Sequence, residues 1–565
     1  MGNFLFKINS MLAIPSVRKG HFVNDTPGSW EAGAARWDDW AAGTVMLGFC
    51  WRLWVAHASY FNTDEAWHFA VANQSSLLAA YKASLTLAHP PLMVFVLYFW
   101  RYLGTSDVML RLPGVVAGSV FCWVFYKWLT VLLGRTVAWC GLIFATFLPP
   151  MIALSAELRQ YSFMLVLAVS AAYLLERALA DNSVGMMVLS CISLYLAMLS
   201  HYSAFLFAAG LGIYVIVRIV SQRPATAVIM LWEAGQVAGV GLAYFLYETH
   251  ISKLGKVYPV AQPLERFGDF YLSDWYFHAG RDHFLHFLYR GTFGVFRFIF
   301  GQTSIGQIAA VLFLAGVIVL AIRGSADTHL PPPRLIAILL AAPFVLSWIA
   351  VAAGLYPYGR TRQCIFLAVF GLAGVSVALA EIARKRIGIA VAFAVLMVMI
   401  CQGFGTLQGR DMLPLAETRH EYMEQAIEFI RSNVSTEDVI LTDRATSFQL
   451  RHYLCGQELV SFEPSATGSG LFRCGGLQVL STGPNDGALS AQSIAAKLQD
   501  REQAGGLRSA KQVWIVEAGW AGGLGETLRS QSPEFEQLEI HSFGRYLEIF
   551  RIPSAPSAKS TQPAR

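Results

Sequence analysis

Long hydrophobic segments, separated by short polar connections, fill roughly the first 400 residues of the chain. About 20 apolar residues cross a bilayer as a helix. Segments near that length lie at 41–60, 111–133, 136–154, 161–180, 184–200, 202–220, 227–248, 305–323, 334–355, 363–383 and 387–405. This pattern predicts a polytopic α-helical membrane protein with about eleven spans. A composition that is 55% hydrophobic and 14% charged excludes a single soluble domain.

Arginines in the connections predict the orientation of these spans. The segment Pro90–Leu103 is apolar but short, and segments of that length are typically interfacial or re-entrant. If it does not span, one face collects the connections that hold Arg135, Arg177, Arg218, Arg323 and Arg384. The positive-inside rule makes that face the cytoplasm. We therefore expect a bacterial cytoplasmic membrane protein whose outer loops, 61–110 and 249–304, face the periplasm.

The two ends of the chain differ from the hydrophobic part, 41–405. Residues 1–40 lack the pattern of a cleaved signal peptide, so we expect a cytoplasmic segment followed by an uncleaved first helix. From 406 to 552 the sequence is polar. There it has a helical pattern at Arg419–Arg431 and strand-like runs at Asp438–Leu441, Gln512–Val516 and Tyr546–Ile552. This predicts a small periplasmic α/β domain, followed by a disordered tail at 553–565.

Cysteines and net charge add little to this picture. Cys455 and Cys474 both lie in the exported domain, where an oxidising periplasm would permit a disulfide, and the sequence leaves their pairing open. The net charge of +5 reflects the arginines of the inner face, so it does not indicate a nucleic-acid partner.

The first outer loop places two carboxylates, Asp64 and Glu65, directly after the first span. A charge at membrane depth costs about 2.5–3.5 kcal/mol, which favours a functional hypothesis. The alternative is a helix cap, because an acidic side chain stabilises a helix N-terminus. Residues 66–81, which follow the two carboxylates, are expected to form an amphipathic helix on the membrane surface. The same loop ends at His89, held at a rigid corner by two prolines, where it could donate to an anion, ligate a metal or be structural.

Two further turns on the outer face carry charge. In the first, Glu157 and Arg159 precede Tyr161, and Arg159 could meet a phosphate or the two carboxylates of the first loop. Glu157 could contact sugar hydroxyls or a metal. The alternative is that Glu157 and Arg159 form an exposed ion pair, which would contribute little to stability. The second turn, Tyr356–Arg362, could bind a phosphate, or hold interfacial aromatics with snorkelling arginines. Its relevant side chains are Tyr356, Tyr358, Arg360 and Arg362.

Histidines and aromatics also mark the long outer loop. Aromatic side chains could stack on a sugar, and the histidine spacing could ligate a metal, although an aromatic belt at the membrane surface is the simpler interpretation. The residues are Trp275, Tyr276, Phe277, His278, Asp282, His283 and His286. His201, between two spans, is expected to be structural.

In their order, these residues resemble the GT-C glycosyltransferases related to protein O-mannosyltransferases. That group, the bacterial family 39 enzymes, includes the aminoarabinose and galacturonic acid transferases of lipid A. The resemblance rests on Thr63-Asp64-Glu65-Ala66, His89-Pro90-Pro91-Leu92, Gly104 with Leu110-Arg111-Leu112-Pro113, Glu157-Leu158-Arg159-Gln160-Tyr161, His201-Tyr202 and the Tyr356–Arg362 turn. Aminoarabinose transferases have an acid and a lysine before the two prolines, where this chain has Ala88-His89. This departure weakens any transfer of their metal site and sugar specificity.

The resemblance implies a GT-C-like fold and an inverting transferase. It would take one sugar from a polyprenyl-phosphate donor at the outer leaflet and pass it to a hydroxyl of a lipid, glycan or protein acceptor. Asp64, with Glu65 beside it, would be the catalytic carboxylate that deprotonates or orients that hydroxyl. The donor phosphate would be bound by Arg159, Arg360, Arg362 and His89, and the substrate by Glu157, Tyr161, Tyr356 and Tyr358. A divalent metal ion is the one cofactor that the resemblance leaves open.

Two other functions suit parts of the same pattern. Many spans with charged residues are also typical of a transporter, here a flippase for lipid-linked sugars. The charges cluster at one membrane face, however, and no inverted repeat is visible. A glycan ligase or polymerase that acts on a longer lipid-linked chain is the other alternative.

Overall fold

The computed structural model describes residues 27–222, 224–253, 272–323, 331–405, 415–456, 470–481, 512–518, 524–531 and 538–552. Its contacts divide the chain into two compact units, Met1–Gly43 and Thr44–Arg565. The second unit holds both the long helices and the C-terminal sheet. The predicted cytoplasmic segment lies largely outside the described residues, and the predicted disordered tail and the boundary at 406 lie wholly outside them.

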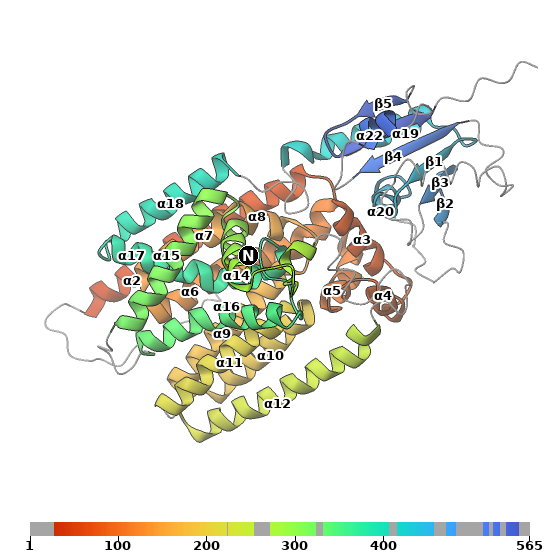
Figure 1. The fold of residues 1–565 in the computed structure, drawn as a ribbon. Coiled ribbons are helices and arrows are strands. Elements are labelled where there is room, and N and C mark those ends of the chain that lie inside the picture. Colours follow the sequence, from red (N-terminus) through yellow and green to blue (C-terminus); the bar gives the residue numbers. More distant parts are fainter. Residues whose placement is uncertain are drawn as a thin grey trace, which may run out of the picture. The chain divides into compact units, whose positions relative to one another are not determined.

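Helices form the hydrophobic part of the chain (Figure 1). They are α2 Pro27–Ala58, α3 Thr63–Ala72, α4 Leu77–Ser84, α5 Leu92–Trp100, α6 Asp107–Leu133, α7 Arg135–Phe147, α8 Pro149–Ala156, α9 Tyr161–Asp181, α10 Val184–Ser200, α11 Ser203–Gln222, α12 Thr226–Thr249, α14 Phe284–Phe300, α15 Thr303–Ile322, α16 Pro333–Ala352, α17 Ala368–Ile382 and α18 Ile387–Gly403. Short 3₁₀ helices lie at Arg101–Leu103, Ile251–Lys253, Ser273–Trp275, Arg362–Leu367 and Leu415–Glu417.

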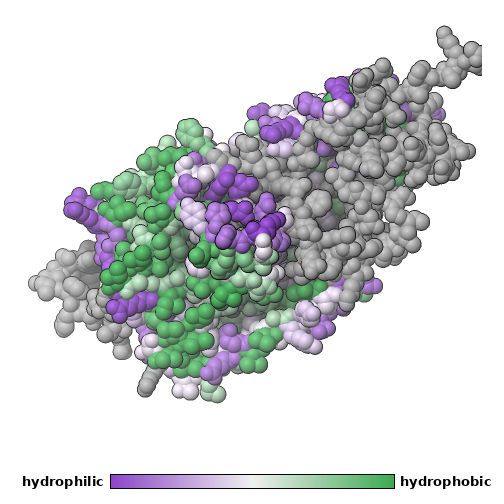
Figure 2. All heavy atoms as spheres, viewed as in Figure 1, coloured by the Kyte–Doolittle hydropathy of each residue, from purple (hydrophilic) through white to green (hydrophobic). Residues whose placement is uncertain are grey.

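Each predicted span falls on helix, but not every helix is long enough to count as one. Among the described residues, 7 helices are long and apolar enough to cross a membrane, or up to 8 if a bent pair forms one span. The predicted number of eleven is therefore not confirmed, in part because α10 and α18 have only 17 residues each. The polytopic α-helical architecture is confirmed. Figure 2 shows hydrophobic residues covering the face over α15 and α18.

The bent pair consists of α7 and α8, which meet at an angle of 54°. Pro149 and Pro150 lack the N–H groups that would bond to the carbonyls of Ala145 and Thr146, four residues earlier. Arg52 of α2 replaces them. Its guanidinium donates to Ala145 O at 2.8 Å and to Thr146 O at 2.9 Å, and the side chain is almost fully buried. A buried arginine thus satisfies the carbonyls at the bend.

The outer loop after α2 differs from the prediction. A single amphipathic helix over 66–81 is wrong, because the helix breaks after Ala72 and a second one, α4, begins with Ser76 as its cap. Most residues of α3 are buried, and it packs against α5 and α20. Helix α5 has 9 residues, well under the length that a membrane span needs.

The C-terminal part is the predicted α/β domain. Its helices are α19 His420–Asn433, α20 Arg444–Tyr453 and α22 Leu524–Gln531, and its strands are β1 Val439–Thr442, β2 Gly470–Cys474, β3 Leu477–Ser481, β4 Val513–Ala518, β5 Glu539–Ser542 and β6 Leu547–Ile552. The strands form one sheet in the order β2-β3-β1-β4-β6-β5, in which β1 is parallel to β3 and β4. The predicted helix and three predicted strands are confirmed as α19, β1, β4 and β6. A disulfide joins Cys455 to Cys474, which resolves the pairing that the sequence left open.

Candidate active site

A capping box begins the helix that carries the two adjacent carboxylates. Asn62 Oδ1 accepts a hydrogen bond from Glu65 N at 3.0 Å, and Glu65 Oε2 accepts one from Asn62 N at 3.0 Å. These reciprocal bonds satisfy two backbone donors at the start of α3. The helix-cap alternative for the two carboxylates therefore holds in part: Glu65 completes the capping box, whereas the N-cap residue is Asn62 and not Asp64.

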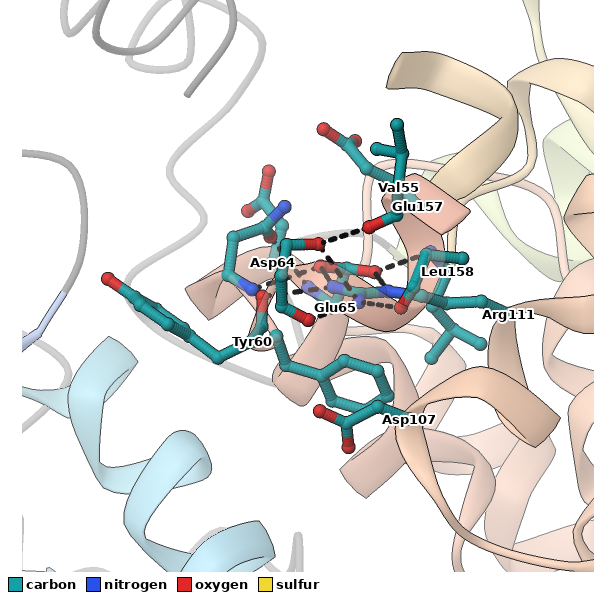
Figure 3. A network of polar contacts seen from close by, with 12 residues as sticks. Val55, Tyr60, Asp64, Glu65, Asp107, Arg111, Glu157 and Leu158 are labelled. Atoms are coloured by element: carbon teal, nitrogen blue, oxygen red, sulfur yellow. Dashed lines mark hydrogen bonds and ion pairs between the residues drawn. The ribbon is translucent and has the colours of Figure 1, made fainter. Parts of the chain in front are cut away.

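Glu65 is held by Arg111, which comes from the first turns of α6 (Figure 3). The guanidinium binds both carboxylate oxygens at 2.7 Å, and each side chain is only 1% exposed. Glu65 Oε1 also accepts from Leu158 N at 2.7 Å. The same arginine donates to Ala56 O at 2.8 Å and Tyr60 O at 3.0 Å. One ion pair therefore joins α3 and α6 to the end of α2 and to the turn after α8.

Asp64 points to a different set of cations. Its Oδ2 atom lies 2.8 Å from Nη1 of Arg159 and 3.9 Å from Nη1 of Arg362. The side chain of Asp64 is 34% exposed, whereas those of Arg159 and Arg362 are 6% and 8% exposed. Burial by itself would raise the pKa of the Asp64 carboxyl, but the two guanidinium charges outweigh it and hold the pKa below its usual range. Asp64 is thus an ionised carboxylate that remains accessible.

Glu157 completes this group from the turn between α8 and α9. Its Oε2 atom accepts from Arg362 Nη1 at 3.1 Å, and its side chain is 14% exposed. Burial raises the pKa of the Glu157 carboxyl, even though Arg362 opposes the shift. Two arginines and two carboxylates from three separate segments therefore meet at one place.

A row of histidines lies beside this group. The ring of His89 lies 6.0 Å from that of His68 and stacks at 5.2 Å on that of His201. The Tyr161 ring is 5.3 Å from that of His201, and the Tyr161 hydroxyl accepts from Arg159 at 3.4 Å. Burial lowers the pKa values of His68 and His201 to about 3 and that of His89 well below its usual range. The three imidazoles are therefore neutral at physiological pH, and each can both donate and accept a hydrogen bond.

Several buried polar atoms in the two segments that carry Asp64 and Arg159 make no hydrogen bond to the described residues. They are Thr63 Oγ1, Arg159 Nε, Ser162 Oγ and both amide atoms of Gln160. Gln160 lies beside His68 but is not in hydrogen-bond geometry with it. Buried polar groups almost always have a partner, so a cluster of exceptions points to a polar ligand or to ordered water.

The Tyr356–Arg362 turn divides its side chains between two roles. Arg362 faces Asp64 and Glu157, as described above. The hydroxyl of Tyr358, which is fully buried, lies 2.8 Å from Thr292 Oγ1, so this side chain packs against α14. Tyr356 is half-buried, and its hydroxyl donates to Gln363 O at 3.2 Å. Arg360 is half-buried as well, and its backbone lies against Gly294 of α14.

The long outer loop supports this turn. Trp275 O accepts a hydrogen bond from Tyr358 N at 2.8 Å, and the indole ring lies so close to Gly359 that a side chain there would clash. Gly359 also has a φ of 156°. The aromatic cluster predicted here therefore contributes Trp275 to packing of the turn.

A small cavity opens next to the group of charges. Its volume is about 50 Å³, which leaves room for about three water molecules. Its lining residues are Val55, Ser59, Tyr60, Asn62, Glu65, Arg111, Ala153, Ala156, Glu157, Leu415 and Thr418. The cavity gives Glu157 a polar space on the side of α2.

Within the described parts of the chain, no group of three or more His, Cys, Asp or Glu side chains is arranged to hold a metal ion. The histidines of the long outer loop are among the residues searched. At the site itself Asp64 and Glu157 are each paired with an arginine, and a neighbouring guanidinium repels a cation. Metal dependence stays an untested prediction.

Sequence reasoning brought the right turns together but missed some side chains. The sequence assigns no role to His68 and Asn62, and it marks Arg111 and Gln160 only as parts of motifs. Arg111 could have been found as a charge in the first turns of a hydrophobic span, where an ionisable group needs a partner. The others carried no signal, because their importance depends on which buried atoms surround them.

Known proteins resemble the chain in part of its sequence and in its fold. Residues 88–245 match the family described as dolichyl-phosphate-mannose-protein mannosyltransferase. No curated protein matches the chain. Among solved structures, ArnT from Cupriavidus metallidurans bound to undecaprenyl phosphate is 12% identical with a TM-score of 0.50, and the match covers 92% of this chain and 98% of that one.

Two other solved structures are more distant. The oligosaccharyltransferase of Archaeoglobus fulgidus is 10% identical with a TM-score of 0.40, and the match covers 73% of this chain and 61% of that one. Arabinosyltransferase EmbB of Mycobacterium smegmatis is 14% identical with a TM-score of 0.40, and the match covers 66% and 32%. The resemblance predicted from the sequence is confirmed at the level of the fold: the chain has the multi-pass GT-C fold, and part of it matches the mannosyltransferase family model.

Proposed function

We propose that the chain transfers one sugar, with inversion, from a polyprenyl-phosphate donor to an acceptor hydroxyl at the outer face of the bacterial cytoplasmic membrane. The observation that carries this proposal is the arrangement around Asp64. A partly exposed carboxylate faces two buried arginines, and the segments that carry Asp64 and Arg159 hold buried polar atoms without hydrogen-bond partners among the described residues. Such a site offers a group for the acceptor, cations for a phosphate and hydrogen-bonding groups for a sugar.

On the acceptor side, Asp64 is the reacting group. The acceptor oxygen attacks the anomeric carbon of the donor, the bond from that carbon to the phosphate oxygen breaks, and the hydroxyl proton passes to Asp64. Because the neighbouring arginines lower the pKa of Asp64, the carboxylate is ionised at physiological pH but is a weak base. Its main contribution is therefore to orient the hydroxyl and to stabilise the positive charge that develops at the sugar.

On the donor side, the leaving polyprenyl phosphate gains negative charge as the bond breaks. Arg159 and Arg362 are buried, charged and fixed by carboxylates, so they need little rearrangement to stabilise that charge. A planar guanidinium can also bind two phosphate oxygens at once. His89 is neutral at this position and would add a hydrogen bond instead of a charge.

The sugar would be held by groups that are polar but uncharged. His68, His201, Gln160 and the Tyr161 hydroxyl lie around the row described above, and all can bond to hydroxyls. Glu157 is the remaining acidic candidate. The ArnT structure with undecaprenyl phosphate supports a polyprenyl-phosphate donor, and the sugar and the acceptor, whether lipid, glycan or protein, stay open.

The disulfide supports the proposed location. Disulfides persist in oxidising compartments such as the periplasm and are rare in the cytosol. The Cys455–Cys474 pair in the C-terminal domain is consistent with a domain, and an adjoining active site, that face the periplasm.

A transfer assay tests the proposal. The purified full chain, reconstituted in liposomes, would be given a panel of radiolabelled polyprenyl-phosphate sugars and candidate acceptors, in parallel with Asp64→Asn, which keeps the shape and removes the charge. We expect product from one donor with the parent and a loss of about 10²- to 10⁴-fold in the variant. If the parent forms no product and instead moves lipid-linked sugar across the bilayer, the flippase hypothesis replaces this one.

A further inference from the structure

The segment between α2 and α3, residues 59–62, connects the first long helix to the one that carries Asp64. We call it the connector. Its backbone joins the C-terminal domain directly. Tyr60 N donates to Thr418 O at 3.0 Å, and Ser59 forms an isolated antiparallel bridge with Arg419. The connector is thus paired with the residues that lead into α19.

Tyr60 inserts its ring into the hydrophobic core of the C-terminal domain. The side chain is 2% exposed, and in Figure 3 it points away from the Glu65–Arg111 pair. It belongs to the same core cluster as buried residues of α19, β1, β4 and β6, among them Met423, Ile427, Ile440, Trp514 and Ile549. A residue of the membrane part therefore completes the core of the exported domain.

Helix α20 holds both backbone polar groups of the next residue, Phe61. Phe61 N donates to the Tyr453 hydroxyl at 2.7 Å, and Phe61 O accepts from Gln449 Nε2 at 2.7 Å. The Phe61 ring stacks on the imidazole of His452 at 4.6 Å. Both backbone groups of Phe61 are thus satisfied by side chains from a domain almost 400 residues later in the chain.

The same helix is also tied to the membrane part. His452 Nε2 lies 2.8 Å from Asp107 Oδ1, and the Tyr453 hydroxyl donates to Asp107 Oδ2. Asp107 begins α6, and one turn later Arg111 holds Tyr60 O and Glu65. The connector therefore lies between two partners that are themselves joined, α20 and the start of α6.

We infer that the C-terminal domain is a positioning element of the active site, and that Gln449 and Tyr453 are its positioning residues. By holding the connector, they fix the start of α3 and hence the place of Asp64 relative to Arg159. The inference rests on the proposed function only for its kinetic consequence. Asn62, the cap of α3, directly follows the residue that α20 holds, so a shift of Phe61 is passed on within three residues.

Two variants test this inference in the full chain. Gln449→Leu with Tyr453→Phe removes both side-chain hydrogen bonds to Phe61, together with the bond from Tyr453 to Asp107, and keeps the size of each side chain. The control, Gln512→Leu, makes the same amide-to-apolar change at a hydrogen bond to Ile552 O, beside strand β6 instead of at the connector. Hydrogen exchange of the α3 amides and the kinetics of transfer would be measured for both and for the parent.

In the first variant we expect amide exchange in α3 to rise about tenfold. We also expect kcat to fall about tenfold or more, with KM for the donor within about twofold of the parent. The reason is that misplacing a reacting group by a fraction of an ångström lowers the rate at which the bound substrates react. The control variant should match the parent. Unchanged α3 exchange, or raised exchange with an unchanged kcat, overturns the inference. If the parent transfers no sugar, the proposed function fails, whereas α3 exchange still decides whether α20 holds the connector.

Discussion

Asp64 and Glu65 are neighbours in sequence but occupy opposite environments. Glu65 is 1% exposed and accepts four hydrogen bonds, from Arg111 twice, Leu158 N and Asn62 N. Asp64 is 34% exposed, and its Oδ2 atom faces Arg159 and Arg362. Consecutive side chains of a helix point about 100° apart, which is enough to give these two different chemistry.

The difference shows how a pair of identical charges can serve two purposes. The carboxylate of Glu65 has its lone pairs taken by backbone and arginine donors, so it has little capacity left for a substrate. It joins the segments that surround the site. Asp64 shares Arg362 with Glu157 and is partly exposed to solvent, so it can exchange a partner during a reaction. The proposal therefore gives catalysis to Asp64 and positioning to Glu65.

Exchanging each acid for its amide should give the largest contrast. In Asp64→Asn we expect transfer to fall by about 10²- to 10⁴-fold and the unfolding temperature to fall less than in Glu65→Gln, because the Asp64 side chain is 34% exposed and that of Glu65 only 1%. In Glu65→Gln we expect the unfolding temperature to fall, because the buried Arg111 loses its countercharge. Transfer assays and thermal unfolding in the same detergent measure both. A stable, inactive Glu65→Gln with an active Asp64→Asn would reverse the assignment.

Removing Arg111, the arginine partner of Glu65, should destabilise the fold nearly as much as the substitution of Glu65 does. Arg111→Met leaves Glu65 buried and unpaired, and breaking a buried ion pair from one side costs about 3–5 kcal/mol. We expect this loss in the free energy of unfolding. Adding Glu65→Gln to the same chain should recover part of it, because a neutral amide replaces the unpaired charge. No recovery in the double variant would mean that packing, and not charge, dominates at this pair.

The charges beside Asp64 predict a smaller effect, on the pH dependence of transfer. Because Arg159 and Arg362 lower the pKa of Asp64, the carboxylate keeps its charge as the pH falls. The value of kcat/KM for the parent should therefore decrease only below the usual titration range of an aspartate. Arg159→Gln removes one charge, so the pKa rises and the acid limb moves to higher pH. Arg159→Lys keeps the charge and is the matched control. An acid limb at the same pH in all three proteins would contradict the role of Asp64.

Much of the fold could be predicted from the hydrophobic pattern alone. Segments of about 20 apolar residues became helices, and strand-like runs such as Gln512–Val516 became β4. Lengths were less predictable, because a proline pair bends α7 against α8 and residues such as Arg52 then stabilise the bend. The short strands β2, β3 and β5 were missed, since local sequence does not determine which segments pair at a sheet edge.

The site could be predicted as a meeting of turns but not as a geometry. Charge on one membrane face indicated that Asp64, Arg159 and Arg362 would come together, and they do. Sequence could not show that Tyr358 would turn into the core instead, because a tyrosine beside a glycine has no fixed direction. Nor could it show the pairing of Phe61 with α20, since contacts across almost 400 residues leave no local pattern.

The helix cap below both carboxylates should give the smallest effect and tests whether they act independently. Asn62→Ala removes the acceptor for Glu65 N, and loss of an N-cap costs about 1 kcal/mol of stability. Asn62→Asp keeps an acceptor and is the control. Because Arg111 and the backbone still hold Glu65, we expect the start of α3 to stay in place and transfer to fall far less than in Asp64→Asn. If Asn62→Ala instead loses as much activity as Asp64→Asn while Asn62→Asp does not, the cap itself positions Asp64, and the division between a structural and a reacting carboxylate would have to include Asn62.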